Sequence, residues 1–95
     1  MADDETLVQY TDENEDGTIE RVFIRRTTDD SYPSGWRYSL HYGTTEGKTI
    51  VRYDNAHEDT KGHERHVDEK TEIIDFPGVM ELYQRFLREI EEFHS

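Results

Sequence analysis

The middle of the chain concentrates residue types that can transfer protons and hold phosphate. Arg52, Asp54 and His57 lie within six residues, and His63 and His66 follow within the next ten. Histidine titrates at about pH 6.5 and can serve as a base or an acid, while a guanidinium can hold phosphate oxygens through two hydrogen bonds. These groups fit metal-independent cleavage of RNA, which needs a base for the 2′-hydroxyl, an acid for the leaving oxygen and a cation for the phosphoryl charge.

On this hypothesis the three imidazoles supply the base and the acid, and either Arg52 or Arg37 holds the phosphate. The same residues also have an ordinary structural interpretation. In that interpretation Arg52 forms an ion pair with Asp54 or a neighbouring acid, and the histidines are loop residues with satisfied hydrogen bonds.

A metal site is a third interpretation of the same stretch. The pattern His63-x-x-His66 could be completed by Asp54, Asp59 or His57, which together offer nitrogen and oxygen ligands. An i, i+3 pair shares a face on a helix but points to opposite faces on a strand, and the surrounding residues show no helical pattern. The chain also has no glycine-rich phosphate loop, serine nucleophile elbow or Walker lysine. We therefore predict no metal and no cofactor.

The elements that must position this cluster are mostly strands. β-Branched and aromatic runs bounded by polar turns predict four strands and a fifth around Lys70–Ile74. The first four cover Glu5–Thr11, Thr18–Arg26, Trp36–Tyr42 and Lys48–Asp54. The polar, histidine-bearing segment Asn55–Glu64 is expected to cross from the fourth strand to Arg65–Ile74, the stretch that holds the fifth strand.

The third strand has the clearest alternation in the chain. Its bulky residues occupy every second position, at Trp36, Tyr38, Leu40 and Tyr42. Side chains at this spacing share one face of a strand, so Arg37, Ser39 and His41 share the other. Such a stripe could stack on nucleic-acid bases, but we expect it to pack in the core.

A helix follows the strands. Apolar residues recur at i, i+3, i+4 spacing from Val79 to Phe93, which predicts an amphipathic helix over residues 77–93. Asp75 stands where an N-cap would be, and Pro77 fits the first turn. One helix across one face of a four- to five-stranded antiparallel meander gives a two-layer α+β fold.

The chain is strongly acidic, and its charge is unevenly distributed. The net charge is −12, which favours adaptation to high salt, because salt screens the self-repulsion of a highly charged compact state. Residues 1–17 hold seven acids and no Lys or Arg, whereas residues 18–66 balance eight acids against eight basic residues. The middle segment also holds four of the five histidines, so we expect the working surface there.

The bulk properties predict one cytoplasmic domain. Its 95 residues are enough for a single domain, with residues 1–4 disordered, 5–74 forming the meander and 77–93 the helix. There is no cysteine, so disulfides and thiolate metal sites are excluded. No apolar run approaches the roughly 18 residues that span a bilayer, and the acidic N-terminus is unlike a secretory signal.

Three sequence blocks together resemble the TumE family, small proteins known as the toxin components of toxin–antitoxin pairs. The blocks are Trp36-Arg37-Tyr38-Ser39-Leu40-His41-Tyr42, then Arg52-Tyr53-Asp54-Asn55-Ala56-His57, then His63-x-x-His66-Val67 before a short C-terminal helix. The resemblance covers about residues 18–93. It implies a cognate antitoxin, often a helix-turn-helix or winged-helix DNA-binding protein.

By position, the resemblance places the family's recurrent polar residues on one set. This set is Arg37, Tyr38, Arg52, Asp54, Asn55, His57, His63 and His66. Family members commonly carry Pro-His-His-x-His in the histidine block, whereas this chain reads Lys61-Gly62-His63-Glu64-Arg65-His66 there, with Glu64 in place of a middle histidine. We take His57, His63, His66, Arg52 and Asp54 as catalytic candidates, and Arg37, Tyr38 and Asn55 as substrate-binding candidates.

Three functions are therefore compatible with the sequence. The leading one is a toxin that acts on RNA or on translation, with a metal-independent ribonuclease as its chemical form. The second is a non-catalytic interaction module that binds a DNA-binding regulator. The third is a small His/Asp metal-binding protein. An exposed edge strand would also allow a homodimer.

Overall fold

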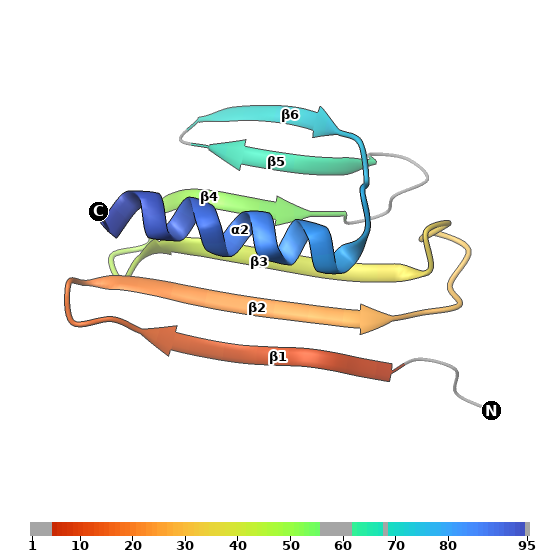
Figure 1. The fold of residues 1–95 in the computed structure, drawn as a ribbon, viewed down its shortest axis with the longest axis horizontal. Helices are drawn as coiled ribbons and strands as arrows, with labels where there is room; N and C mark the ends of the chain where they lie inside the picture. The colour runs from red at the N-terminus through yellow and green to blue at the C-terminus, as the bar shows by residue number, and fades with distance from the viewer. Residues whose placement is uncertain (1–4, 56–61, 68, 95) are drawn as a thin grey trace.

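The computed structural model describes residues 5–55, 62–67 and 69–94. In this part of the chain, six strands form one antiparallel sheet in the order β1-β2-β3-β4-β5-β6 (Figure 1). They are β1 (Glu5–Glu13), β2 (Thr18–Arg26), β3 (Trp36–Thr44), β4 (Thr49–Asp54), β5 (His63–Val67) and β6 (Lys70–Ile74). The predicted α+β meander is confirmed, with one strand more than expected. The prediction that residues 1–4 are disordered lies outside the described residues.

The additional strand is β5, which begins at the end of the segment expected to cross between strands and continues through residues 65–67, where no strand was expected. Its residues His63, Arg65 and Val67 lie on one face, and Glu64 and His66 lie on the other. Because both faces carry polar side chains, this strand has no apolar alternation to mark it in the sequence. Pairing with β4 and β6 on either side supplies its backbone hydrogen bonds.

Helix α2 (Val79–His94) lies across one face of the sheet, over β3 and β4 (Figure 1). The core forms between them, and its largest fully buried side chains include Tyr42, Tyr53 and Phe86. Tyr38, Leu40 and Tyr42 are buried in this core, and Trp36 packs partly buried against it. The prediction that the aromatic stripe of β3 belongs to the core is confirmed.

The helix begins later than expected. Gly78 lies just before its first residue, and the Gly78 carbonyl accepts a hydrogen bond from the Leu82 N–H at 3.0 Å. Gly78 has φ of 130°, a conformation that other residues rarely adopt. Asp75 is therefore not the N-cap and Pro77 is not in the first turn, since both precede the helix. No helix in the described part of the chain is long and apolar enough to cross a membrane.

The face of the sheet opposite α2 is called the open face below. Directly paired residues of antiparallel strands project to the same face. The register pairs Arg21 with His41, His41 with Arg52 and Arg52 with His66. These four residues therefore form one row across β2, β3, β4 and β5 on the open face, which we call the Arg–His row.

Candidate functional site

The Arg–His row places two imidazoles on either side of one guanidinium. His41 on β3 and His66 on β5 are the direct cross-strand partners of Arg52 on β4. Neighbouring strands lie about 4.8 Å apart, so the two histidine backbones are separated by two strand spacings, roughly 10 Å. A phosphate bound at Arg52 would have one imidazole on each side.

Asp54 organises one end of the row. Its Oδ2 lies 2.9 Å from Arg52 Nε and 3.5 Å from His66 Nε2. The carboxylate is almost buried, with 8% of the side chain exposed, whereas 47% of the Arg52 side chain is exposed. The buried acid therefore orients Arg52 and His66, and nearly half of the Arg52 side chain stays exposed. The structural interpretation of the sequence also predicted the Arg52–Asp54 ion pair. This ion pair is therefore common to the catalytic and the structural interpretations.

His66 has further partners around its ring. Its Nδ1 lies 2.9 Å from the Thr71 hydroxyl, and its Nε2 lies 3.7 Å from Glu64 Oε1. The ring is thus held from β6 on one side and by the carboxylates of Asp54 and Glu64 on the other. These contacts fix its orientation at the edge of the row.

His41 lies between Arg52 and Arg21, at the centre of the row. Burial lowers the pKa of His41 below its usual value, and the two neighbouring arginines, Arg52 and then Arg21, lower it further. A lowered pKa keeps the imidazole neutral at neutral pH, which is the form that can accept a proton. Its Nε2 lies 3.1 Å from the Thr49 hydroxyl, and its buried Nδ1 has no hydrogen-bond partner among the described residues. These properties make His41 a candidate for a general base, with Nε2 as the nitrogen that is not buried without a partner.

Sequence reasoning did not select His41 or Arg21 as site residues. His41 was recognised as facing away from the aromatic stripe, but nothing in the sequence shows which residues of other strands lie beside it. The signal that could have found it is the alternation of β3 combined with the register of β2 and β4, which the structure supplies.

Gly43 makes room for the His41 ring. A Cβ at Gly43 would lie 2.2 Å from the Lys48 carbonyl oxygen and 3.0 Å from His41 Cε1. The register of β3 and β4 shifts between Tyr42 and Gly43, and this irregularity brings the chain of Lys48 close. Only glycine fits this position without moving the backbone.

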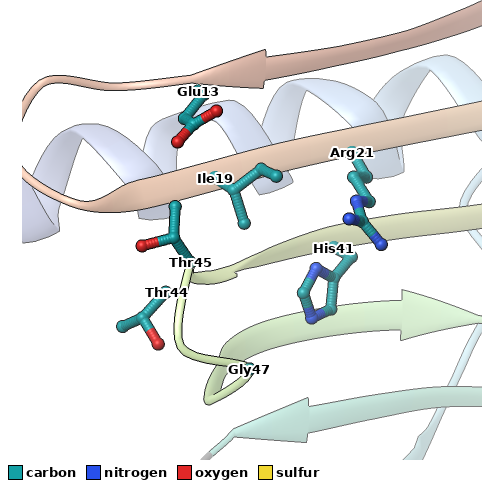
Figure 2. A pocket seen from close by; sticks show the side chains of 7 residues that line it. All are labelled: Glu13, Ile19, Arg21, His41, Thr44, Thr45 and Gly47. Carbon is teal, nitrogen blue, oxygen red and sulfur yellow. The ribbon is translucent and has the colours of Figure 1, made fainter.

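A cavity of about 440 Å³ continues from the end of the row toward the hairpin turns. We call this cavity the turn pocket. Figure 2 shows the residues that line it, which are Glu13, Ile19, Arg21, His41, Thr44, Thr45 and Gly47. The β1–β2 turn and the β3–β4 turn meet here, and the Thr45 N–H donates a hydrogen bond to the Gly17 carbonyl at 3.0 Å. Arg21 and His41 thus belong both to the Arg–His row and to the wall of this pocket.

Two of the predicted site residues lie in the interior, on the α2 side of the sheet. His63 is 8% exposed and Tyr38 is 2% exposed. His63 Nδ1 lies 2.7 Å from the Tyr38 hydroxyl, and the His63 ring stacks on Phe76 with 4.4 Å between centroids. His63 and His66 therefore point to opposite faces of β5, as the spacing predicted for a strand, and they cannot ligate one metal together.

Asn55 is fully buried at the end of β4 and fastens that end to β3. Its Oδ1 accepts a hydrogen bond from the Tyr38 N–H at 3.0 Å, and its Nδ2 donates to the Trp36 carbonyl at 2.6 Å. Arg37 is exposed, with its guanidinium 5.9 Å from the centre of the Tyr32 ring. His57 and Asp59 lie outside the described residues. Of the predicted site residues, the structure thus brings together Arg52, Asp54 and His66 on the open face, and Tyr38, Asn55 and His63 in the interior.

One carboxylate–imidazole group has the spacing of metal ligands. Ligand atoms of Asp54, Glu64 and His66 lie within 4.8 Å of one another. Asp54 Oδ2 is already bonded to Arg52, and the guanidinium charge would oppose a cation at the same oxygen. The ion pair with Arg52 therefore disfavours a metal ion at this group.

Fold and site together define a small α+β protein with acid–base groups on the uncovered face of its sheet. Among protein families, the one described as toxin TumE matches residues 2–94. The chain belongs to the TumE toxin family, and membership of a toxin family implies a cognate antitoxin. No curated protein and no solved structure matches the chain.

Proposed function

We propose that this chain is the toxin of a toxin–antitoxin pair and that it cleaves RNA on its open face without a metal ion. The observation that carries the proposal is the pairing of His41 and His66 with Arg52 across three adjacent strands. A base and an acid on opposite sides of a phosphate-binding cation are the groups that this reaction requires.

The step assigns one role to each member of the row. Neutral His41 takes the proton of a ribose 2′-hydroxyl, and the 2′-oxygen forms a bond to the adjacent phosphorus. The bond from phosphorus to the 5′-oxygen breaks, and His66 gives that oxygen a proton. Arg52 stabilises the charge on the phosphoryl oxygens. The products are a 2′,3′-cyclic phosphate and a 5′-hydroxyl.

The local charge of the open face favours this assignment despite the net charge of −12. The register places Arg21, Arg25, Arg37 and Arg52 on this face, with both histidines of the row. Short-range hydrogen bonds and ion pairs can hold RNA where long-range attraction is weak or screened by salt. We propose that the protein acts in a cytoplasm of high salt concentration, as its composition indicates, and that the open face binds RNA under these conditions.

We propose that the partner is a helix-turn-helix or winged-helix DNA-binding antitoxin, as the family resemblance implies. A non-catalytic toxin that acts only by binding, or an inhibitor of translation that does not cut RNA, would use the same partner. These alternatives differ from the proposal in whether the Arg–His row is needed for the effect.

The test is growth of a host after induction of this chain alone, compared with His41→Ala, His66→Ala and Arg52→Ala at equal folded levels. We expect arrest by the native chain and relief by each substitution, with new RNA ends that carry a 2′,3′-cyclic phosphate. Arrest that survives all three substitutions would favour the interaction module. No arrest at verified folded levels would show that this chain is not a toxin by itself.

A further inference from the structure

The turn pocket adjoins the proposed reaction centre, and its walls are held in place by the backbone. The Asn14 N–H donates to the Thr18 carbonyl at 2.8 Å, and the Gly47 N–H donates to the Thr44 carbonyl at 3.0 Å. With the Thr45–Gly17 bond between the two turns, the backbone holds the walls of the pocket in place without a ligand. Such preformed walls reduce the entropic cost of binding.

The lining of the turn pocket suits one flat, polar ring. Ile19 offers an apolar surface, Thr44 and Thr45 offer hydroxyls, and Glu13 offers two carboxylate oxygens (Figure 2). The cavity of about 440 Å³ lies within the range of about 300–1,000 Å³ that is usual for small-molecule sites. Because His41 and Arg21 form the wall toward the Arg–His row, a base in this pocket would leave its ribose beside His41.

We propose that the turn pocket binds the guanine base of the nucleotide whose 2′-hydroxyl is deprotonated by His41. An ionised carboxylate only accepts hydrogen bonds, so the matching base edge must present donors alone. Guanine presents two adjacent donors, N1–H and the N2 amino group. Adenine and cytosine place a ring-nitrogen acceptor beside their amino group, and uracil has a single N–H between two carbonyl oxygens. Glu13 is therefore the specificity-determining residue.

This inference rests on the proposed RNA cleavage, but binding can be measured without any cleavage. The probes are guanosine 3′-monophosphate and uridine 3′-monophosphate, titrated into the full chain by calorimetry at fixed high salt. We expect the native chain to bind the guanosine compound more tightly. Glu13→Gln exchanges one acceptor for a donor, and we expect it to lower the ratio of the two affinities about tenfold.

Glu15→Gln is the matched control, because Glu15 is an exposed acid of the same turn that does not line the pocket. It removes the same charge and should leave the affinity ratio unchanged. Equal affinities for the two nucleotides in the native chain, or a ratio unaltered by Glu13→Gln, would overturn the inference.

Sequencing of cleavage products separates this inference from the proposed function. Cleavage by the native chain preferentially after guanosine, with the preference lost in Glu13→Gln, supports both the pocket assignment and the nuclease proposal. Cleavage without preference for the upstream base overturns the pocket assignment and leaves the nuclease proposal standing. Guanosine binding that depends on Glu13 without any RNA cleavage supports the pocket and overturns the nuclease proposal.

Discussion

The two faces of the sheet hold the same polar residue types in different surroundings. On the α2 side, the Tyr53 hydroxyl donates to Glu89, and Arg65 Nη2 donates to the same carboxylate at 2.7 Å. Burial, followed by the hydrogen bond to Glu89, raises the pKa of Tyr53 to about 12. On the open face, the corresponding cation Arg52 is nearly half exposed.

The difference shows that polar groups on the side of the covering helix are engaged by contacts with the helix and with the buried aromatic rings. Arg65 is 23% exposed and lies over the Tyr53 ring, with a helix carboxylate in contact. Arg52 has no helix above it in the described part of the chain, and its ion pair comes from its own strand. The histidines follow the same division, since His63 is buried on the α2 side of the sheet, whereas His41 and His66 lie on the open face.

The sharpest way to separate the faces is to remove their histidines one at a time. We expect His41→Ala and His66→Ala to lower the rate of RNA cleavage roughly 100- to 10,000-fold, because each removes a proton-transfer group. Both variants should unfold at nearly the native temperature. His63→Gln should instead lower the melting temperature and keep the native rate per folded molecule. A loss of rate confined to His63→Gln would reverse the assignment of the two faces.

A pair of phenylalanines makes the same comparison for stability. Phe86 on α2 is fully buried in the core, so Phe86→Ala should cost about 3–5 kcal/mol of unfolding free energy. Phe23 is the cross-strand partner of Ser39, which places it on the open face, where it is partly exposed. Phe23→Ala should cost about 1 kcal/mol, as is usual for a single substitution. Urea unfolding measures both, and equal costs would contradict the assignment of the core to the α2 side.

Two arginines extend the comparison to charged groups. Arg65→Gln breaks hydrogen bonds to Glu89 and Tyr53 and should destabilise the fold by about 1–3 kcal/mol. Arg21 is exposed on the open face, and Arg21→Gln should change stability by less than about 0.5 kcal/mol while weakening RNA binding. The measurements are urea unfolding and titration with an uncleavable oligonucleotide. A large stability loss in Arg21→Gln would show that the open face is also structural.

The pKa of His41 tests the row from within. Its folded-state pKa lies below the unfolded value of about 6.5. The unfolded chain therefore binds more protons in this range, and the stability that this group contributes above pH 6.5 is lost as pH falls through the folded pKa. We expect Arg52→Gln to raise the His41 pKa while burial, the larger cause, keeps it below the usual value. A titration of the ring protons by NMR that shows no change in this variant would separate His41 from Arg52.

The smallest effect concerns the net negative charge of the whole chain. Self-repulsion at a net charge of −12 should weaken as salt rises, since the Debye length falls to about 3 Å at 1 M. We expect the melting temperature to increase between 0.1 M and 3 M potassium chloride. A melting temperature that stays constant or falls would remove the salt adaptation that the composition indicates.

Much of the architecture was predictable from local pattern. The alternation of Trp36–Tyr42 located β3 and its buried face, and the apolar spacing from Val79 to Phe93 located the helix. The strand His63–Val67 was missed because both of its faces carry polar groups, so it has no apolar period. The start of the helix was misplaced because Asp75 and Pro77 fit a first turn locally, whereas the backbone turns at Gly78 before the helix begins.

The candidate site was less predictable than the fold. Arg52, Asp54 and His66 were selected from the sequence, and the structure places them in contact. His63 was selected with them, but side chains alternate along a strand, so its position on β5 turns it inward. His41 and Arg21 were not selected, because their distance from Arg52 along the chain gives no sign that they lie beside it.

The sequence by itself determined which residues are apolar or charged, where the first four strands turn, and that one helix must cover one face. These properties follow from periods of 2 and 3.6 residues, which are local. Only the tertiary structure decided that Arg21, His41, Arg52 and His66 form one row, and that two turns close a pocket beside it. Register joins residues of different strands, and a shift of one residue would turn each of these side chains to the other face.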